Sequence, residues 1–454
     1  MTESEPGLLR HIGLRSATML VVASMIGAGI FTTTGYQAAD LGHPGLIFLL
    51  WILGGVLALC GALCFAELGA AMPKAGAEYV YIRESYGSAL AFMSAFVALF
   101  AGFSAPIAGA LKGLVLYLGH FVPTLAEDLT LIGGLHLNDV VAIGFVWALV
   151  AIHISGVRAG IGFNDVITIL KIGGIVLVLL AAATLGEGNA SRVFTVAPHY
   201  HELSGLDKLS YSATSLIFVT FCYLGWNGSA YVAAEMDNPQ RDLPRSLLLG
   251  TGLVTVLYIG LNAMFFYGAG VEGLAGVGEV GLVSSRALFG DFGVTMVTLL
   301  MCISILASAS AMTVIGPRVY FAFGEDFKGL SILHRVSPKT GAPSAALLLQ
   351  GVVTSAIILS GTLDQILQYA GFTLTLFASI AVSCVIALRI KRPEMPRPFK
   401  AWGYPFTPLF FLGVSIWTMI WAVRGRPQES SLGLVTVVVG GVIFYAFSHN
   451  AEKV

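Results

Sequence analysis

The sequence has little charge and no excess of either sign. Only 11% of its 454 residues are charged, with 24 Lys and Arg against 25 Asp and Glu, whereas soluble domains carry about 25% charged residues. This shortage argues against a soluble protein. The absence of a basic excess argues against nucleic acid as a partner.

The sequence also lacks a disulfide framework, a nucleotide-binding motif and a metal-binding motif. The five cysteines lie inside apolar segments without the spaced Cys and His partners of a metal site, so they are interpreted as small buried hydrophobic residues. No phosphate-binding loop is present, and the apolar segments hold neither paired carboxylates nor a His-rich motif. The sequence therefore predicts no enzyme, no cofactor and no metal, and any transport would be secondary rather than ATP-driven.

The chain instead contains many long apolar segments. Hydrophobic residues make up 56% of it and its mean hydropathy is +0.85, and apolar runs of about 20 residues are long enough to cross a bilayer as helices. The pattern predicts an all-α polytopic membrane protein with twelve transmembrane helices, called spans 1 to 12. They are expected at residues 16–38, 45–70, 89–122, 138–155, 163–185, 211–234, 245–269, 289–321, 343–360, 366–389, 405–423 and 432–448.

The charges of the loops agree with this number of spans. If the N-terminus is cytoplasmic, loops on that side contain 17 of the Lys and Arg residues and loops on the other side contain 5. The remaining two, Lys112 and Lys171, lie inside spans. Because cytoplasmic loops carry such an excess, we expect a multi-pass protein of the cell membrane (inner or plasma membrane) with both termini cytoplasmic.

Two spans are interrupted by glycine at mid-depth. Span 1 contains Gly27-Ala28-Gly29, and span 6 contains the run 224–228, Leu-Gly-Trp-Asn-Gly. Backbone groups freed at that depth must be satisfied by protein, water or a ligand. Because the interruptions are five spans apart, two inverted five-helix units would place them at matching positions, as at transporter binding sites. Glycines that merely allow close helix packing are the alternative.

Four motifs resemble those of permeases of the amino acid/polyamine/organocation (APC) superfamily. The first is the S-M-I-G-x-G-I-F run of span 1, and the second, from Pro73 to Tyr81, matches P-K-A-G-G-E-Y-x-Y except that Ala77 replaces the second glycine. The third is the E-x-x-N-P-x-R-x-x-P-R run that begins at Glu235, and the fourth is the segment 337–343 before span 9. Residues 225–227, Gly-Trp-Asn, are similar to the L-amino-acid transporter (LAT) branch in particular.

The resemblance implies the LeuT-type fold, a 5+5 inverted repeat with discontinuous helices 1 and 6, plus two extra C-terminal helices. Animal members of the LAT branch are joined to a single-span glycoprotein through a cysteine between spans 3 and 4. Residues 123–138 contain no cysteine, so no disulfide-linked heavy chain is expected. The chain then divides into a cytoplasmic segment (1–15), a first repeat of spans 1 to 5 (16–200), a second repeat of spans 6 to 10 (201–390), and spans 11 and 12 with a short C-terminus (391–454).

An amino acid bound at the interruption of span 1 needs donors for its carboxylate and acceptors for its ammonium. The second half of span 1 offers free N–H groups at its N-terminal end, which we assign to Ala28 and Gly29. Such small residues let a ligand approach the backbone closely. The first half of the span ends in carbonyls, and that of Met25 is the predicted acceptor for the ammonium. Ile26 and Gly27 complete the substrate-binding set in span 1.

In span 6 the resemblance implies that the carbonyls of Phe221 and Leu224 also accept from the ammonium. The ring of Phe221 is either a gate over the site or ordinary core packing. The amide of Asn227 either binds substrate or ties helices across the interruption. No acidic residue lies near the middle of spans 1, 3, 6, 8 or 10, so a cationic side chain would be buried without a counter-charge. A neutral amino acid is therefore the expected substrate.

Lys171 lies eight residues after residue 163, where span 5 is expected to begin. Charged residues at such depth usually face the bundle interior and mark function. The resemblance implies that its ammonium replaces the cation that sodium-driven relatives bind between spans 1 and 8. Its expected partners are span 1 carbonyls near Gly27 and the hydroxyl of Ser308, or of Ser304 one turn earlier. Because burial disfavours the charged form of a lysine, a proton-coupling site and a permanently charged strut both stay open.

The expected function is sodium-independent secondary transport of neutral L-amino acids by alternating access, as a proton symporter or an amino-acid exchanger. The partners are then the amino acid, protons in the case of symport, and the lipid bilayer. A cationic amino acid or polyamine permease is the alternative within the superfamily. A receptor or channel is the alternative from another class, although no pore-lining polar stripe or filter loop is found.

Overall fold

In the computed structural model, the regular elements of the described residues are helices, apart from two isolated β-bridges. The described residues are 8, 10–127, 129–131, 135–360, 363–425 and 427–451, without the side chains of 363–372, 425, 427–430, 432 and 447–451. Within them, eight helices are long and apolar enough to cross a membrane, or nine if the bent pair in span 1 is one span. Helices also cover the other predicted spans, while the number twelve and the inverted repeat stay predictions.

The first repeat as predicted contains the helices of spans 1 to 5 and their connectors. In chain order they are α1 (Leu14–Met25), η1 (Gly29–Phe31) and α2 (Thr33–Leu41) in span 1, α3 (Pro44–Ala71) in span 2, the connector α4 (Glu78–Tyr86), α5 (Ser88–Val97), η2 (Ala98–Ser104) and α6 (Ala105–Leu118) in span 3, α7 (Pro123–Ala126), α8 (Leu137–Ile154) in span 4, α9 (Val157–Leu185) in span 5, η4 (Ala190–Val193) and α10 (His199–Glu202).

The remaining helices belong to spans 6 to 12. They are α11 (Gly205–Cys222) and η5 (Gly228–Glu235) in span 6, α12 (Pro239–Leu274) in span 7, α13 (Val280–Asp326) in span 8, η6 (Lys328–His334), α14 (Ser344–Ser360) in span 9, α15 (Leu363–Lys391) in span 10, α16 (Phe406–Gly425) in span 11 and α17 (Pro427–Ala451) in span 12.

Local sequence explains where several helices begin. Ser204 and Asp207 form a reciprocal capping box at the start of α11, which satisfies N–H groups that have no partner inside the helix. In α3, Pro44 occupies the first turn, where its missing N–H costs nothing, and His43 Nδ1 accepts from the backbone N–H of Leu46. Capping thus fixes the starts of spans 2 and 6.

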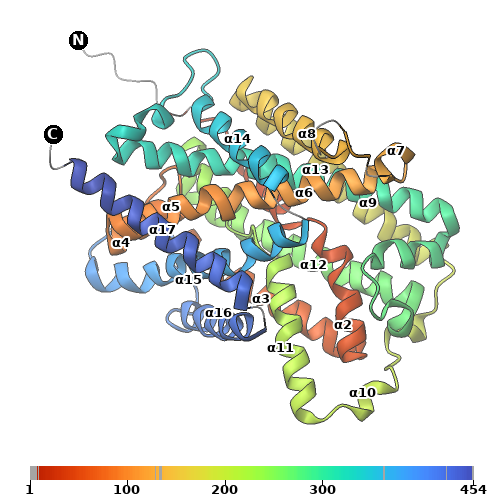
Figure 1. The fold of residues 1–454 in the computed structure, drawn as a ribbon. Coiled ribbons are helices and arrows are strands. Elements are labelled where there is room, and N and C mark those ends of the chain that lie inside the picture. The colour runs from red at the N-terminus through yellow and green to blue at the C-terminus, as the bar shows by residue number, and fades with distance from the viewer. Residues whose placement is uncertain are drawn as a thin grey trace.

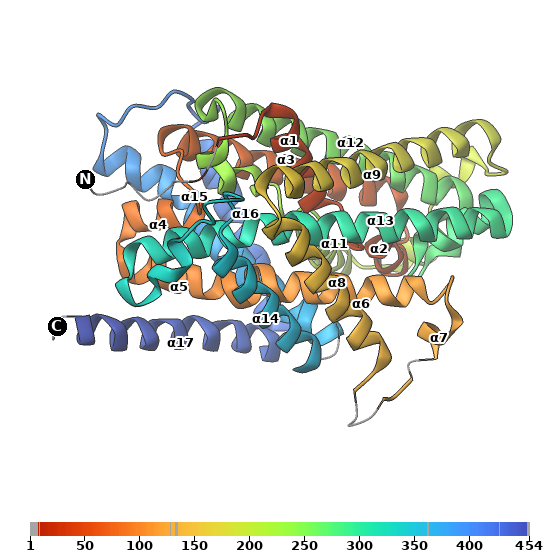
Figure 2. The same cartoon turned by 90° about the horizontal axis from the view of Figure 1, so that it is seen from above.

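The helices form one bundle around the broken spans (Figure 1). The helices α6, α9 and α13 run nearly parallel across the molecule in Figure 2, and α17 lies along its outer edge, where it packs on α5 and α15. Spans 1 and 7 pack in the interior, because α12 contacts both α1 and α3, while α13 contacts α1, α6 and α9. The interruption of span 1 is therefore surrounded by spans 5, 7 and 8.

Both interruptions predicted from the sequence are present. The helix α1 ends at Met25, and the axis of the following segment is bent by 44° relative to it. In span 6, α11 ends at Cys222 and η5 begins at Gly228, with Gly225 between them at a φ of +100°. Only glycine adopts such a φ readily, so the turn in span 6 depends on Gly225.

The two broken spans meet at the end of the bundle where α1 begins. The backbone N–H groups of His11 and Ile12 donate to the carbonyl of Glu235 at 2.9 and 3.0 Å, and the N–H of Asp237 donates to the carbonyl of Ile12. The Glu235 carboxylate accepts two hydrogen bonds from the Arg318 guanidinium, at 2.7 and 2.9 Å, and both side chains are buried. This buried pair fastens η5 to α13.

Further ion pairs close the same end. Arg83 of α4 pairs with an aspartate at the end of α13, and Arg389 of α15 pairs with Glu67 of α3 at 2.6 Å. Together these pairs join both halves of the chain, so this end is closed in the structure. They are named the closing network, which consists of Glu235–Arg318, Arg83–Asp326 and Glu67–Arg389.

Replacing Glu235 by glutamine leaves the buried Arg318 charge uncompensated. Breaking a buried pair by removing one partner costs about 3–5 kcal/mol. We expect E235Q to lower the free energy of unfolding by that order, seen as a lower melting temperature of the purified protein. The control is R392Q, which breaks the exposed Arg392–Glu84 pair and should change stability by less than about 1 kcal/mol. Equal effects of the two substitutions would contradict the role of the buried pair.

Candidate functional site

The structure brings the two interruptions into direct contact. A Cβ on Gly225 would lie 2.7 Å from the backbone of Ser24, and a Cβ on Gly228 would lie 3.0 Å from the Ser24 hydroxyl. A Cβ on Gly29 would lie 2.8 Å from Cys222 Sγ. The glycines of each interruption therefore let its backbone approach the other span closely, and the freed backbone groups of both converge on one region.

A tyrosine from span 7 joins the two interruptions. The buried hydroxyl of Tyr258 lies 2.8 Å from the Met25 carbonyl and 2.9 Å from the Cys222 carbonyl. The hydroxyl has only one proton, so it donates fully to one of these two carbonyls at a time. The other carbonyl then keeps a lone pair that a ligand can use. The Tyr258 ring is held by edge contacts with Trp51 and Tyr223, with ring centroids 5.2 and 5.0 Å apart. The sequence offered no signal for this role, because it depends on tertiary neighbours.

Some of the predicted donors and acceptors already form hydrogen bonds within the protein, and others do not. Among the described residues, the N–H groups of Ala28 and Gly29 have no acceptor and the Leu224 carbonyl has no donor. The Phe221 carbonyl accepts from the Leu224 N–H at 3.1 Å, which leaves it one lone pair. A Cβ on Gly27 would meet nothing within 4 Å. Open space therefore lies beside Gly27, next to unpaired donors.

The side chains of Phe221 and Asn227 have different surroundings. The ring of Phe221 is 37% exposed, so it is not part of the packed core. The amide Nδ2 of Asn227 donates to the Tyr231 hydroxyl at 3.2 Å, and that hydroxyl donates to Glu78 Oε2 at the same distance. Asn227 therefore ties the interruption to the connector α4, and its contact with substrate stays a prediction, as does the gating role of Phe221.

Lys171 reaches from α9 to the interruption of span 1. Its side chain is fully buried, and Nζ donates to the carbonyls of Ala23 and Ile26 at 3.2 and 2.6 Å. Among the described residues it forms no ion pair and no hydrogen bond with Ser308. The hydroxyl of Ser304 is also buried and has no partner in that part of the chain. The serine of the predicted coupling pair stays a prediction.

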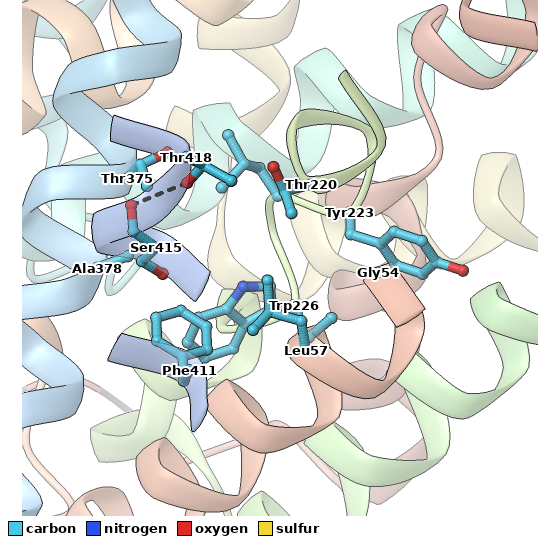
Figure 3. Close-up of a pocket in the computed structure, with 12 residues that line it drawn as sticks. Gly54, Leu57, Thr220, Tyr223, Trp226, Thr375, Ala378, Phe411, Ser415 and Thr418 are labelled. Atoms are coloured by element: carbon cyan, nitrogen blue, oxygen red, sulfur yellow. Dashed lines mark hydrogen bonds between the residues drawn. The ribbon is translucent and has the colours of Figure 1, made fainter. Parts of the chain in front are cut away.

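A cavity lies beside the interruption of span 6, between it and α3, α15 and α16 (Figure 3). Trp226 and Phe411 meet on one side of it, with ring centroids 5.7 Å apart, and Ser415 and Thr418 lie on another side. Of the predicted substrate-binding residues, only Leu224 lines it. This cavity therefore does not coincide with the donors of span 1.

The region around the interruptions supplies N–H donors, carbonyl acceptors and one buried amine. Within the described part of the chain, no group of three or more His, Cys, Asp and Glu side chains could hold a metal ion. Backbone donors and acceptors of this kind suit the charged ends of a small dipolar molecule.

The family model described as amino acid permease matches residues 12–444. The chain belongs to the amino acid permease family. This assignment confirms the predicted membership of the APC superfamily. The permease is accordingly an amino acid transporter with several membrane-spanning helices, rather than an enzyme.

Several relatives align over nearly the whole permease. The b(0,+)-type amino acid transporter 1 of Rattus norvegicus is 26% identical, over 96% of this chain and 88% of the relative. The large neutral amino acids transporter small subunit 2 of Homo sapiens is 25% identical, over 96% and 80%. The serine/threonine exchanger SteT of Bacillus subtilis (strain 168) is 26% identical, over 98% of both chains. These proteins are similar to the permease along nearly all of its length.

A substitution at Gly27 tests whether the open space beside it holds substrate. Because a Cβ there meets no atom within 4 Å, Gly27→Val should leave the melting temperature within a few degrees of the wild type. It should weaken amino acid binding at least tenfold, because its methyl groups would occupy the space of the ligand. Binding is measured in purified protein as protection by amino acids against thermal unfolding.

Gly29→Val provides the contrast. Its Cβ would press on Cys222 Sγ at 2.8 Å, so overpacking should lower stability by about 1–3 kcal/mol. From the sequence, Gly29 is expected to offer an N–H donor and room for the ligand, and its close approach to Cys222 shows that it also packs against span 6. If Gly27→Val is as stable as the wild type and still binds amino acids with undiminished affinity, the ligand does not occupy the space beside Gly27.

Proposed function

We propose that the permease carries neutral L-amino acids across the cell membrane by alternating access and without sodium. The observation that carries this proposal is the contact between the two interrupted spans. Unpaired N–H groups at Ala28 and Gly29 suit a carboxylate, because the N-terminal end of a helical segment favours negative charge. Carbonyls at Met25, Phe221 and Leu224 suit an ammonium. Both charged groups of an amino acid then find backbone partners in one region.

The surroundings of the interruptions favour a neutral side chain. The carboxylates of the closing network are already paired with arginines, and both oxygens of Glu78 on α4 already accept hydrogen bonds from Ser94 and Tyr231, so none of these groups is free to bind a cationic substrate. A substrate cation without a counter-charge would carry a large desolvation cost. The names of two relatives, a large neutral amino acids transporter and a serine/threonine exchanger, agree with such a substrate.

In this proposal Lys171 is the fixed cation of the cycle. Its ammonium binds two carbonyls, those of Ala23 and Ile26, where the first half of span 1 ends. A sodium ion coordinated by carbonyl oxygens would play the same part. We therefore propose that Lys171 is a strut that holds the interruption of span 1, and that Ser308 of span 8 becomes a second partner in another step of the cycle.

Alternating access is supported by the closed end of the bundle. The closing network joins η5 to α13 and α3 to α15, so these contacts must break when a substrate leaves toward that side. We assign this side to the cytoplasm, with both termini there, because of the excess of Lys and Arg in its loops. The two five-helix repeats of the proposed LeuT-type fold would move relative to each other, and exchange is the favoured mode because one relative is named an exchanger.

Sodium-free counterflow tests the transport activity. Proteoliposomes loaded with one unlabelled neutral L-amino acid are diluted into buffer with the labelled form, in choline chloride. We expect accumulation of label for at least one neutral amino acid and none for lysine, arginine or putrescine. Sodium chloride should leave the rate unchanged within a factor of two. A strict sodium requirement would contradict the proposal, and transport of cationic substrates alone would favour the polyamine alternative.

Lys171→Ala removes the strut. We expect counterflow to fall at least tenfold at every pH from 5 to 8, because the carbonyls of the interruption lose their donor. The matched control is Lys112→Ala, which removes the other lysine within a span, one that pairs with Asp139 away from the interruption. An unchanged rate and pH profile in Lys171→Ala would remove this residue from the mechanism.

A further inference from the structure

The carboxylate of Glu78 on the connector α4 forms hydrogen bonds that have no role in the proposed transport site. Glu78 is the first residue of α4 and lies outside the membrane-spanning helices. Its Oε1 accepts from Ser94 Oγ of α5, and its Oε2 accepts from the Tyr231 hydroxyl of η5, both at 3.2 Å. Tyr231 in turn accepts from Asn227 Nδ2 at 3.2 Å. A chain of hydrogen bonds thus runs from the connector to the interruption of span 6.

Glu78 differs from the carboxylates of the closing network because no cation pairs with it within the described part of the chain. The cations on nearby elements are engaged elsewhere: Arg83 with Asp326, and Lys391 with the carbonyl of Ser85. Arg318 and Arg389, on α13 and α15, are bonded to the closing network. The titratable groups around Glu78 are uncharged ones, Tyr81 of α4, Tyr231 of η5 and Cys384 of α15.

This environment changes the acidity of the carboxyl group. Burial raises the pKa of Glu78 from its ordinary value of 4.5 to about 7, although the hydrogen bonds from Ser94 and Tyr231 act in the opposite direction. A carboxyl group held between three elements without a counter-charge therefore changes its protonation near neutral pH. Protonation must alter these hydrogen bonds, because the donors from Ser94 and Tyr231 both point toward the charged form of the carboxylate.

We propose that Glu78 is a proton-binding site that controls the interruption of span 6 and makes transport depend on pH on the α4 side. A hydronium ion on the α4 side gives up one proton and leaves as water, and the proton forms an O–H bond on Oε2. That O–H then donates to the Tyr231 oxygen, so the Tyr231 hydroxyl must donate to another acceptor. The Oδ1 of Asn227 becomes that acceptor when the amide turns over. One proton thus reverses the direction of these hydrogen bonds and turns the amide at the interruption, and no covalent bond of the protein is broken.

The direction of the effect follows from linkage. The closed conformation holds the proton more tightly than a conformation in which Glu78 is hydrated and has its ordinary pKa of 4.5. Lowering the pH from 7 toward 4.5 therefore favours the closed conformation, by up to about tenfold for each pH unit. Above pH 7 this contribution disappears. Because turnover requires this end to open, acid should slow exchange.

The test compares the wild type with E78Q, a neutral mimic of the protonated form. In proteoliposomes, wild-type exchange of a neutral amino acid should fall several-fold as the pH on the α4 side drops from 8 to 5, with a midpoint near 7. E78Q should be independent of pH over this range, at the slow rate of the wild type in acid. E84Q, a second glutamate on α4, should keep the wild-type profile. S94A should move the midpoint upward, because it removes a donor to the charged form.

This inference rests on the proposed function, so a second measurement separates the two. In detergent, the melting temperature of the wild type should fall relative to that of E78Q as the pH rises from 5 to 7, and the difference should level off above pH 7. Exchange with the same pH profile in wild type and E78Q would overturn the inference and leave the transport proposal standing. Parallel melting profiles in wild type, E78Q and S94A would overturn the proton site even if no amino acid were exchanged.

Discussion

The permease depends on one constraint: backbone groups released inside a membrane must find partners. Two spans break where lipid offers no hydrogen bonds, and the molecule meets this cost by placing the breaks against each other. Gly225 and Gly228 lie so close to Ser24, and Gly29 so close to Cys222, that a side chain at any of these glycines would meet the other span. Tyr258 satisfies carbonyls on both sides. Among the described residues, the N–H groups of Ala28 and Gly29 and the carbonyl of Leu224 are left without a partner, and these suit the carboxylate and the ammonium of an amino acid.

Other parts of the fold hold this arrangement in place. Lys171 fixes the end of α1 from span 5, and the Glu235–Arg318 pair fixes the end of span 6 to span 8. Asn227 and Tyr231 connect the same interruption to Glu78 on α4. Each contact joins an interruption to an element from a different part of the chain. These contacts connect the closed end of the bundle to the region where the substrate is proposed to bind.

Much of this organisation could be predicted from the sequence. The glycine interruptions, the long apolar segments and a lysine at mid-depth can be recognised from local sequence. The structure has a helix break at each of the two interruptions, and Lys171 contacts the one in span 1. The role of Tyr258 could not be predicted, because a tyrosine in a span acquires meaning only from what lies opposite. Glu78 lay in the motif from Pro73 to Tyr81, which indicated a family but not a contact with span 6. The number of twelve spans and the inverted repeat stay predictions, since eight or nine of the described helices are long and apolar enough to cross a membrane.

The central claim is that backbone groups of the two interruptions recognise both charged ends of an amino acid. Competition with truncated analogues tests this most directly. For an amino acid that is exchanged in proteoliposomes, we compare inhibition by the same molecule, by its amine without the carboxylate, and by its acid without the ammonium. The account predicts that each analogue inhibits at least a hundredfold more weakly than the intact amino acid. Inhibition by either analogue at the same concentration as the amino acid would contradict it.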